Sequence, residues 1–172
     1  GKNFDIGTDF ILFKNRLSGT IEYYNKVTDR MIFDVATTIS NGQYTISQNI
    51  GSMYNKGIEV ELKGDVIRNK NFTWNLGING STIKNRITKM PESNKEIISG
   101  TKKLKEGQSL YDYWVREWMG VNPVNGEALY RADVWNPSNS FVDGKGDTVT
   151  NSINNARYHY AGTAIPDLFG GI

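Results

Sequence analysis

The 172-residue sequence contains no cysteine and only one histidine. Without cysteine there is no disulfide framework, no thiolate nucleophile and no cysteine-ligated zinc site. A multi-histidine metal site is excluded in the same way, and we predict that His159 is a loop histidine without a catalytic role. No phosphate-binding loop or dinucleotide fingerprint is present either. We therefore expect neither an enzyme nor a resident cofactor.

The sequence also lacks any run of about 18 apolar residues, which excludes a transmembrane helix. Strands of a membrane barrel remain possible, because such strands distribute their hydrophobicity by alternation. The net charge of +2 gives no electrostatic indication of nucleic acid as a partner.

What the sequence does have is strict alternation of apolar and polar residues. In the clearest stretch, Ile58, Val60 and Leu62 alternate with Glu59, Glu61 and Lys63. A period of two is typical of a β-strand whose two faces meet different surroundings. We predict four such strands, at residues 2–14, 17–33, 50–67 and 72–81.

The connections between these strands alternate between short and long. We predict a two-residue turn at Asn15 and Arg16, which would place Leu12 beside Gly19 and Phe13 beside Ser18, and a second short turn at residues 68–71. Long connections follow near residues 40 and 95. Short turns at one end and long loops at the other are typical of outer-membrane β-barrels.

The charged face needs water, because an unpaired buried charge costs several kcal/mol. It therefore lines either a wide lumen or the solvent side of a soluble antiparallel sheet. Strands of about 13 to 17 residues exceed the usual globular length of about 5 to 6, which favours the barrel. Phe13, Phe72 and Trp74, near the short turns, fit an interfacial aromatic girdle.

The second half of the sequence predicts outer loops. Residues 110–120 and 127–130 suggest a strand pair joined by a turn at 122–126, residues 136–155 read as an exposed loop, and a strand resumes near residue 158. Aromatic side chains in this region could stack on sugar rings, dock a protein lid, or pack one loop on another. The candidates for ligand or lid contact are Tyr111, Tyr113, Trp114, Trp118 and Trp135.

Two weaker patterns have simpler explanations. Glu59 and Glu61 could be imagined as a general acid and base, but Lys63 and Asp65 continue the same row, so a solvated face explains all four. The segment Asp143 to Asp147 faintly resembles a calcium loop, yet Lys145 stands where an oxygen ligand is needed, and we predict a polar turn.

Several segments together resemble the SusC/RagA family of TonB-dependent outer-membrane transporters. They are LSGTIEYYNK at 17–26, NIGSMYNKGIE at 49–59, FTWN at 72–75, GVNPVNGEALY at 120–130 and IPDLFGG at 165–171. They occur in the family's order and cover nearly the whole chain. Each motif is weak alone, but the combination is specific.

The resemblance implies that residues 1–172 form part of a single large β-barrel domain, from the C-terminal half of a Bacteroidota-type outer-membrane importer. Family members close the barrel around an N-terminal plug, contact the TonB complex through an N-terminal segment, and pair with a SusD-like surface lipoprotein. We expect the plug and the TonB-contacting segment to lie outside this sequence. Substrates in the family are typically oligosaccharides or peptides.

This interpretation assigns the two faces. Outer-membrane lipid would contact Ile6, Phe10, Ile21, Ile58, Val60, Leu62, Leu76 and Ile78. The lumen-facing residues would be Asp9, Glu22, Glu59, Glu61, Asn75 and Asn79. Two alternatives remain open at this point: a soluble β-sandwich or adhesin-like module that binds carbohydrate, and a passive porin without energy coupling.

The face assignment predicts unequal tolerance at adjacent positions. Leu62→Arg, if it lies near the bilayer midplane, should cost about 2 to 4 kcal/mol and impair assembly, whereas Glu61→Gln should be tolerated. The measurement is the amount of heat-modifiable receptor in the outer membrane. Equal tolerance of the two substitutions would count against a membrane wall.

Overall fold

The computed structural model describes residues 1–36, 45–92 and 94–172, and nearly all of its regular structure is antiparallel strand. The expected all-β fold is therefore confirmed. The long connection predicted near residue 40 lies outside the described residues. The chain divides into two compact units: unit 1 comprises residues 1–97, 104–111 and 165–172, and unit 2 comprises residues 98–103 and 112–164. No helix in the described ranges is long and apolar enough to cross a membrane.

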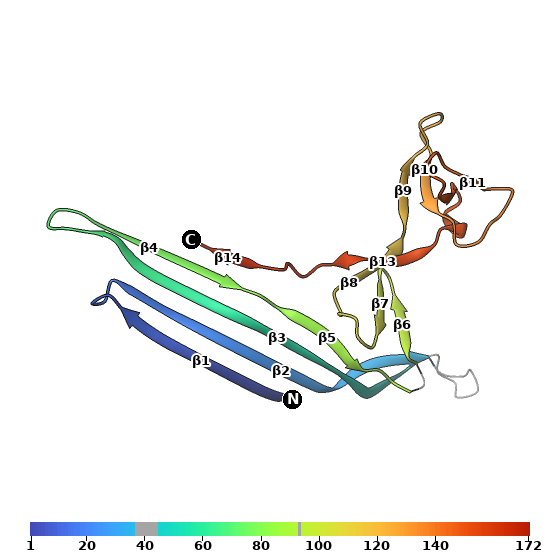
Figure 1. The fold of residues 1–172 in the computed structure, drawn as a ribbon. Coiled ribbons are helices and arrows are strands. Elements are labelled where there is room, and N and C mark those ends of the chain that lie inside the picture. The colour runs from blue at the N-terminus through green and yellow to red at the C-terminus, as the bar shows by residue number, and fades with distance from the viewer. Residues whose placement is uncertain (37–44, 93) are drawn as a thin grey trace. The chain divides into compact units, whose positions relative to one another are not determined.

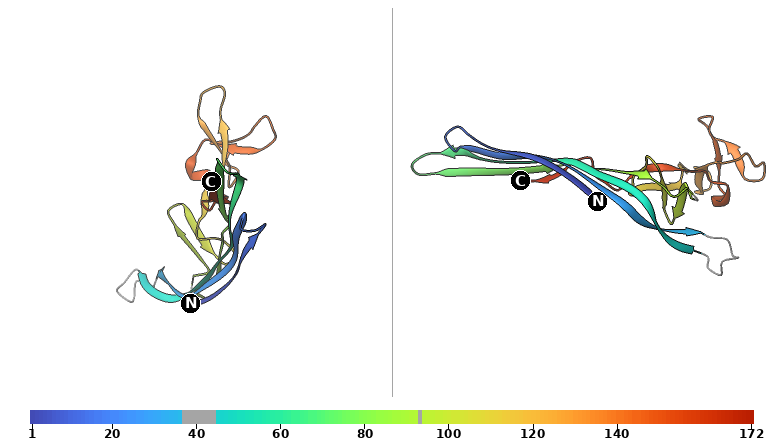
Figure 2. Two further views of the ribbon diagram at one scale, coloured as in Figure 1. Left: turned by 90° about the vertical axis from the view of Figure 1, so that its left-hand side faces the viewer. Right: turned by 90° about the horizontal axis from the view of Figure 1, so that it is seen from below.

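Unit 1 contains a long sheet in the order β1-β2-β3-β4-β14, with β5 also paired to β3 (Figure 1). The strands are β1 (Lys2–Leu12), β2 (Leu17–Ala36), β3 (Thr45–Arg68), β4 (Thr73–Ser81), β5 (Lys84–Lys89) and β14 (Phe169–Gly171). Because β14 returns to pair with β4, residues 82–168 form the connection between two neighbouring strands of this sheet. Figure 2 shows that the long strands twist together rather than lying flat.

The strand register sorts the side chains onto two faces. Phe10, Gly19, Leu62 and Ile78 are neighbours in one row across four strands, and Asp9, Thr20, Glu61 and Asn79 form the adjacent row. Directly paired residues point to the same side of a sheet, and successive residues point to opposite sides. The long sheet thus has one apolar face and one polar face, as the alternation predicts.

The first hairpin corrects the predicted register. Its turn covers Phe13 to Arg16, and Leu12 pairs with Leu17 rather than with Gly19. Phe13, Lys14 and Asn15 all adopt positive φ angles of 54° to 64°, and the Arg16 amide donates to the carbonyls of Leu12 and Phe13. The prediction was wrong by two residues, and a shift of two leaves every strand residue on its expected face.

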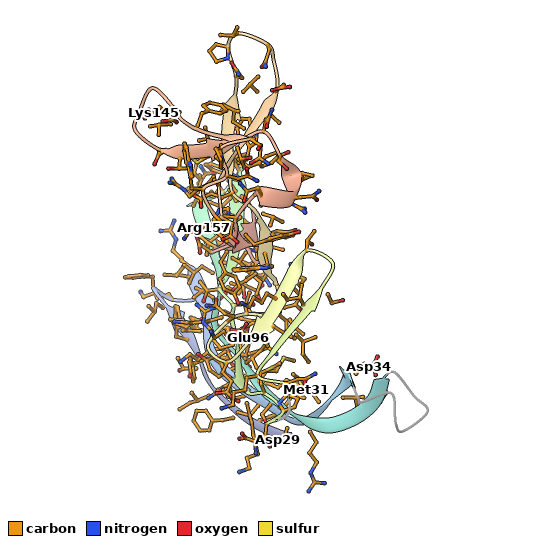
Figure 3. The ribbon with its side chains drawn as sticks, turned by 90° about the vertical axis from the view of Figure 1, so that its right-hand side faces the viewer. Asp29, Met31, Asp34, Glu96, Lys145 and Arg157 are labelled. Atoms are coloured by element: carbon orange, nitrogen blue, oxygen red, sulfur yellow. The ribbon has the colours of Figure 1, made fainter. Side chains whose placement is uncertain are left out.

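A bulge at the far end of β2 redirects the chain towards a small core. Arg30 has a φ of 59°, and the register shifts on either side of Met31. In consequence Asp29 stays exposed, while Met31, labelled in Figure 3, packs against the buried pair Ile87 and Met90. Bulges commonly re-aim a side chain in this way.

Asn85 holds the following segment onto the long sheet. Its side-chain nitrogen donates to Asn55 Oδ1 at 2.7 Å, and its Oδ1 accepts hydrogen bonds from Ser109 Oγ and the Leu110 amide, both at 2.9 Å. Asn85 is only 2% exposed. These hydrogen bonds satisfy its buried amide group and fix residues 109–110 against β3 and β5.

Most of unit 2 is built from short strands. They are β8 (Asp112–Arg116), β9 (Trp118–Val121), β10 (Ala128–Arg131), β11 (Ser140–Val142), β12 (Thr148–Thr150) and β13 (Tyr158–Thr163), with a short 3-10 helix, η2 (Ile153–Asn155). One sheet has the order β11-β12-β10-β9. The other has the order β13-β8-β7-β6, in which β6 (Glu96–Ser99) and β7 (Lys102–Lys105) contribute residues to both units.

Three segments of unit 2 meet in a closed set of backbone hydrogen bonds. The Glu117 amide donates to the Arg157 carbonyl, Arg157 donates to Arg131, and Arg131 donates to Glu117, at 2.8 to 2.9 Å. Ion pairs reinforce the junction, because Arg131 contacts Glu117 at 2.7 Å and Asp147 at 2.9 Å. This polar junction supplements a small apolar core around Leu129 and Val149.

The structure corrects two local predictions in this region. The expected strand at 110–120 is divided into β8 and β9, while the β9–β10 hairpin around residues 122–126 is confirmed. The expected exposed loop at 136–155 instead contains the β11–β12 hairpin, in which Val149 and Thr150 are completely buried. Residues 136–155 are mostly polar, so the sequence pattern did not indicate the few residues that face inward.

Gly57, on the polar face, lies where no larger residue fits. An added Cβ would come within 1.9 Å of the Thr82 carbonyl oxygen and 2.7 Å of the Tyr24 hydroxyl. We predict that Gly57→Ala destabilises the sheet by about 1 to 3 kcal/mol. On the same face, Gly77→Ala should be tolerated, because its Cβ would meet only the Lys63 Cγ at 3.6 Å.

The measurement is the temperature at which the folded, heat-modifiable form of the complete receptor is lost. Gly57→Ala should lower this temperature and Gly77→Ala should not. Equal midpoints for the two variants would show that the backbone contact at Gly57 is unimportant.

Candidate functional sites on the long sheet and the outer segments

The polar face of the long sheet brings together all six residues predicted to face a lumen. Glu22 pairs directly with Glu59, and Glu61 pairs directly with Asn79. Asp9 and Asn75 lie on the same face, opposite Thr20 and Asp65 respectively. The register thus confirms that these side chains share one face, while the identity of what they face stays a prediction.

Neighbouring polar side chains hold much of this face in place. Thr20 Oγ1 donates to Asp9 Oδ1 at 2.7 Å, Lys63 forms an ion pair with Glu61, and the Asn75 amide donates to Asp65. Because Glu61 is paired with Lys63 beside it, the face resembles a solvated polar surface rather than an acid–base pair in a closed pocket.

A shallow hollow of about 460 Å³ lies over the middle of this face. Its lining includes Glu22, Glu59, Glu61, Asn79 and Phe169. Like charges directly opposite each other in a sheet repel, so the pair Glu22 and Glu59 requires water or a polar partner in front of it. The hollow is therefore best explained as part of a hydrated surface. Its acidic residues alone do not identify a ligand.

The opposite face leaves large apolar side chains uncovered. Ile6, Ile21, Ile58 and Ile78 are 60%, 43%, 48% and 40% exposed. The remaining residues predicted to contact lipid share this face by register: Phe10, Val60, Leu62 and Leu76. A continuous apolar surface of this kind is unusual on a soluble protein and marks a contact with lipid or another protein.

Aromatic residues mark both ends of the apolar face. Trp74 pairs with Ile67 near the short turns, where Phe13 and Phe72 are also exposed. At the other end, Tyr23 pairs with Ile58 and its ring lies 6.4 Å from that of Phe4. The sequence indicated the first set, and the structure adds Tyr23 at the second boundary, as expected for two aromatic girdles.

The five aromatic residues proposed for ligand or lid contact do not form one cluster. Tyr111 belongs to unit 1, and the other four belong to unit 2. Trp118, on β9, is 62% exposed and Trp135, after β10, is 56% exposed. Tyr113 and Trp114 are successive residues of β8 and therefore point to opposite faces of that strand.

Trp114 instead joins two tyrosines that the sequence did not single out. Its ring stacks on Tyr158 at 6.1 Å and meets the edge of Tyr160 at 4.8 Å. Lys103 lies 4.5 Å from the Trp114 ring, and Arg116 lies 4.7 Å from the Tyr158 ring. The cross-strand pairing of β8 with β13 produces this aromatic and cationic surface. Trp114 and Tyr158 lie 44 positions apart in the sequence, so no local pattern predicts their contact.

His159 lies between these two tyrosines in the sequence but on the other face of β13. The prediction of a loop histidine was wrong, because His159 is part of a strand and pairs with Val115. Its Nδ1 lies 3.2 Å from the Val115 carbonyl oxygen.

The segment from Asp143 to Asp147 is a turn, as predicted. Asp143 Oδ1 accepts hydrogen bonds from the backbone amides of Lys145 and Asp147, and Asp147 is paired with Arg131. Figure 3 shows Lys145 at the tip of this hairpin. Within the described ranges, no group of three or more acidic, histidine or cysteine residues is arranged to hold a metal ion.

Long antiparallel strands with an uncovered apolar face and a charged face define a strip of membrane β-barrel wall. Comparison with known proteins agrees: residues 1–171 match the family described as TonB dependent receptor-like, beta-barrel. The chain belongs to this family.

Its relatives point to the SusC/RagA type. The chain is 32% identical over 129 residues to TonB-dependent receptor P3 of Formosa agariphila, covering 70% of this chain and 13% of P3. It is 34% identical over 88 residues to TonB-dependent receptor SusC of Bacteroides thetaiotaomicron, covering 51% of this chain and 9% of SusC.

Solved structures agree on the fold. A chain of the RagAB peptide transporter superposes with a TM-score of 0.76 and 25% sequence identity, covering 98% of this chain and 18% of that chain. The predicted resemblance to SusC/RagA receptors is thus confirmed. The sequence spans less than a fifth of the length of each of these three relatives.

The turn at Asp143 predicts a response to acid. Hydrogen bonds from backbone amides, chiefly that of Asp147, stabilise the carboxylate and hold the pKa of Asp143 below its usual value of 3.8. A lowered pKa stabilises the folded hairpin above pH 3.8, and this contribution is lost as the pH falls through the lowered pKa. Amide-exchange protection at Lys145 and Asp147 should therefore fall in that range.

The matched variant is Asp143→Asn, whose side-chain oxygen still accepts hydrogen bonds but does not titrate. Its protection factors should change less between pH 5 and pH 3 than those of the wild type. An identical loss in both proteins would place the acid sensitivity at another group.

Proposed function

We propose that this chain forms part of the barrel wall and the outer loops of a TonB-dependent, SusC-like importer in a Bacteroidota-type outer membrane. The importer takes up oligosaccharides or peptides. It acts with a SusD-like surface lipoprotein and receives energy from the TonB complex through parts of the receptor outside this sequence. The chain itself has no enzymatic role.

The observation that carries this proposal is the uncovered apolar face of the long sheet. A soluble β-sandwich or adhesin-like module would bury that face against a second sheet. Here the exposed isoleucines extend across β1 to β4, and the buried apolar residues in the described part of the chain lie elsewhere, around Ile87 and Val149. Family membership and the uncovered apolar face together favour lipid as the environment of that face.

The polar face then lines the interior of the barrel. Asp9, Glu22, Glu59, Glu61, Asn75 and Asn79 are the lumen-facing residues. Charged side chains on this side are supported by their mutual contacts and by water, which a wide barrel interior supplies.

The outer segments supply the ligand or lid contacts. Trp118 and Trp135 are well suited to this role, because each presents a large, exposed ring with a polar tip. Tyr111, Tyr113 and Trp114 complete the candidate set. Lys103, beside Trp114, also orients its ring, so Trp114 combines a packing role with its proposed contact role.

Location and energy coupling are tested together in the native organism. An antibody raised to residues 136–155 should detect a large, heat-modifiable band in the outer membrane, and uptake should stop when TonB is deleted. Uptake that continues without TonB would favour a passive porin. A small soluble band would overturn the importer.

The contact residues are tested in the complete receptor. Trp118→Ala combined with Trp135→Ala should weaken binding of the substrate or the lipoprotein by about 30-fold, as expected for the loss of two interfacial tryptophans that together contribute about 2 kcal/mol. Val124→Ala, at a turn position that is 91% exposed, is the control. The readouts are uptake of labelled oligosaccharide or peptide and co-purification of the lipoprotein, at equal receptor levels.

If the tryptophan variant matches the Val124 control in both readouts, these rings are not contact residues. Such a result would leave the importer assignment intact, because location and TonB dependence are measured separately.

A further inference from the structure

A row of cations follows the apolar band on the outward face of the long sheet. Lys56 lies two residues beyond Ile58 on β3, so it shares the apolar face, and it pairs directly with Lys84 on β5. One row further out, Tyr54 pairs with Arg86, and the Lys56 Nζ lies 5.1 Å from the Tyr54 ring. The register is regular through these rows, so the two lysines and Arg86 all point outward.

The length of the apolar band places this row at a membrane boundary. From Ile67, which pairs with Trp74, to Ile58 is nine residues along β3, or about 30 Å of strand. With a strand tilt of about 40°, this length spans about 23 Å, close to the height of about 25 Å of a barrel's apolar band. Lys56 and Lys84 therefore lie just beyond the edge of the hydrocarbon region, at the end of the long sheet opposite the short turns.

The pair Lys56 and Lys84 places two positive charges directly opposite each other. Like charges directly opposite each other in a sheet are destabilising, and neither Lys56 nor Lys84 has a carboxylate partner among the described residues. Asp29 is the nearest acidic residue on this face by register, but it lies two rows beyond Lys56, in the same row as Lys89. An anion outside the chain would remove the repulsion.

We propose that Lys56 and Lys84, with Arg86 in the next row, bind the phosphate groups of a phosphorylated glycolipid in the outer leaflet of the membrane. This inference rests on the proposed function, since it requires the apolar face to meet lipid and the long loops to lie outside the cell. Lipid is favoured over a protein partner because the cations continue the lipid-contacting face and stand at headgroup height. Their alkyl stems cover apolar surface while the ammonium groups reach the phosphates.

The test uses the complete receptor, reconstituted into nanodiscs of phosphatidylcholine alone or with lipid A that carries or lacks its phosphates. Wild-type receptor should retain phosphorylated lipid A through delipidation, as measured by native mass spectrometry, and should show a higher unfolding midpoint in its presence. The variant combining Lys56→Gln with Lys84→Gln should bind this lipid about 30-fold more weakly, because each surface cation contributes about fivefold.

The matched control combines Lys70→Gln with Lys145→Gln, which removes the same charge from a short turn and from a hairpin tip. It should retain the lipid as the wild type does. Equal retention of lipid A by both double variants would overturn the proposal, and so would equal retention of lipid A with and without its phosphates. So would loss of the lipoprotein, rather than of lipid, from the Lys56 and Lys84 variant.

The outcomes separate this inference from the proposed function. A receptor that inserts into nanodiscs but shows no preference for phosphorylated lipid would remove the lipid site and leave the importer. A receptor that enters none of the bilayers would overturn both.

Discussion

Backbone hydrogen bonding between long neighbouring strands is the constraint on which the rest of this structure depends. In hydrocarbon no water is available to satisfy an amide or a carbonyl group, so each strand must pair fully with the next. The unbroken register between residues 17–29 of β2 and residues 52–64 of β3 meets this requirement. The same register creates the two faces, because pairing determines which side chains stand side by side. The apolar face and the polar face therefore arise from one ladder of hydrogen bonds.

Close backbone approach gives glycine a role on each face. On the apolar face, Gly19 leaves room for Phe10 and Leu62, since an added Cβ would lie 2.6 Å from atoms of both side chains. On the polar face, Gly57 accommodates the ring of Tyr24, whose hydroxyl donates to the Thr82 carbonyl at 3.3 Å. In both places an aromatic side chain covers the glycine of a neighbouring strand. Such pairs support a twisted sheet while keeping its surface filled.

Beyond the long sheet, polar contacts compensate for small cores. Asn85 ties residues 109–110 to the sheet through buried side-chain hydrogen bonds, and the junction of Glu117, Arg131 and Arg157 joins the segments of unit 2. Exposed tryptophans and cation-flanked rings can then be presented from segments that have their own internal supports. For the outer loops of the proposed importer, this arrangement gives recognition residues a defined position although little apolar burial is available.

The sequence by itself determined the four long strands and the family. It also determined the two faces of the long sheet, because a period of two places alternate side chains on opposite sides whatever the exact register. That is why the two-residue error at the first turn left Asp9, Glu22 and the other polar residues correctly grouped. Only the tertiary structure decided which distant segments meet. The contact of Trp114 with Tyr158 and Tyr160, the anchoring by Asn85 and the pairing of Lys56 with Lys84 all join residues far apart in the chain. Local patterns carry no information about such pairings, since they depend on how complete strands align and pack.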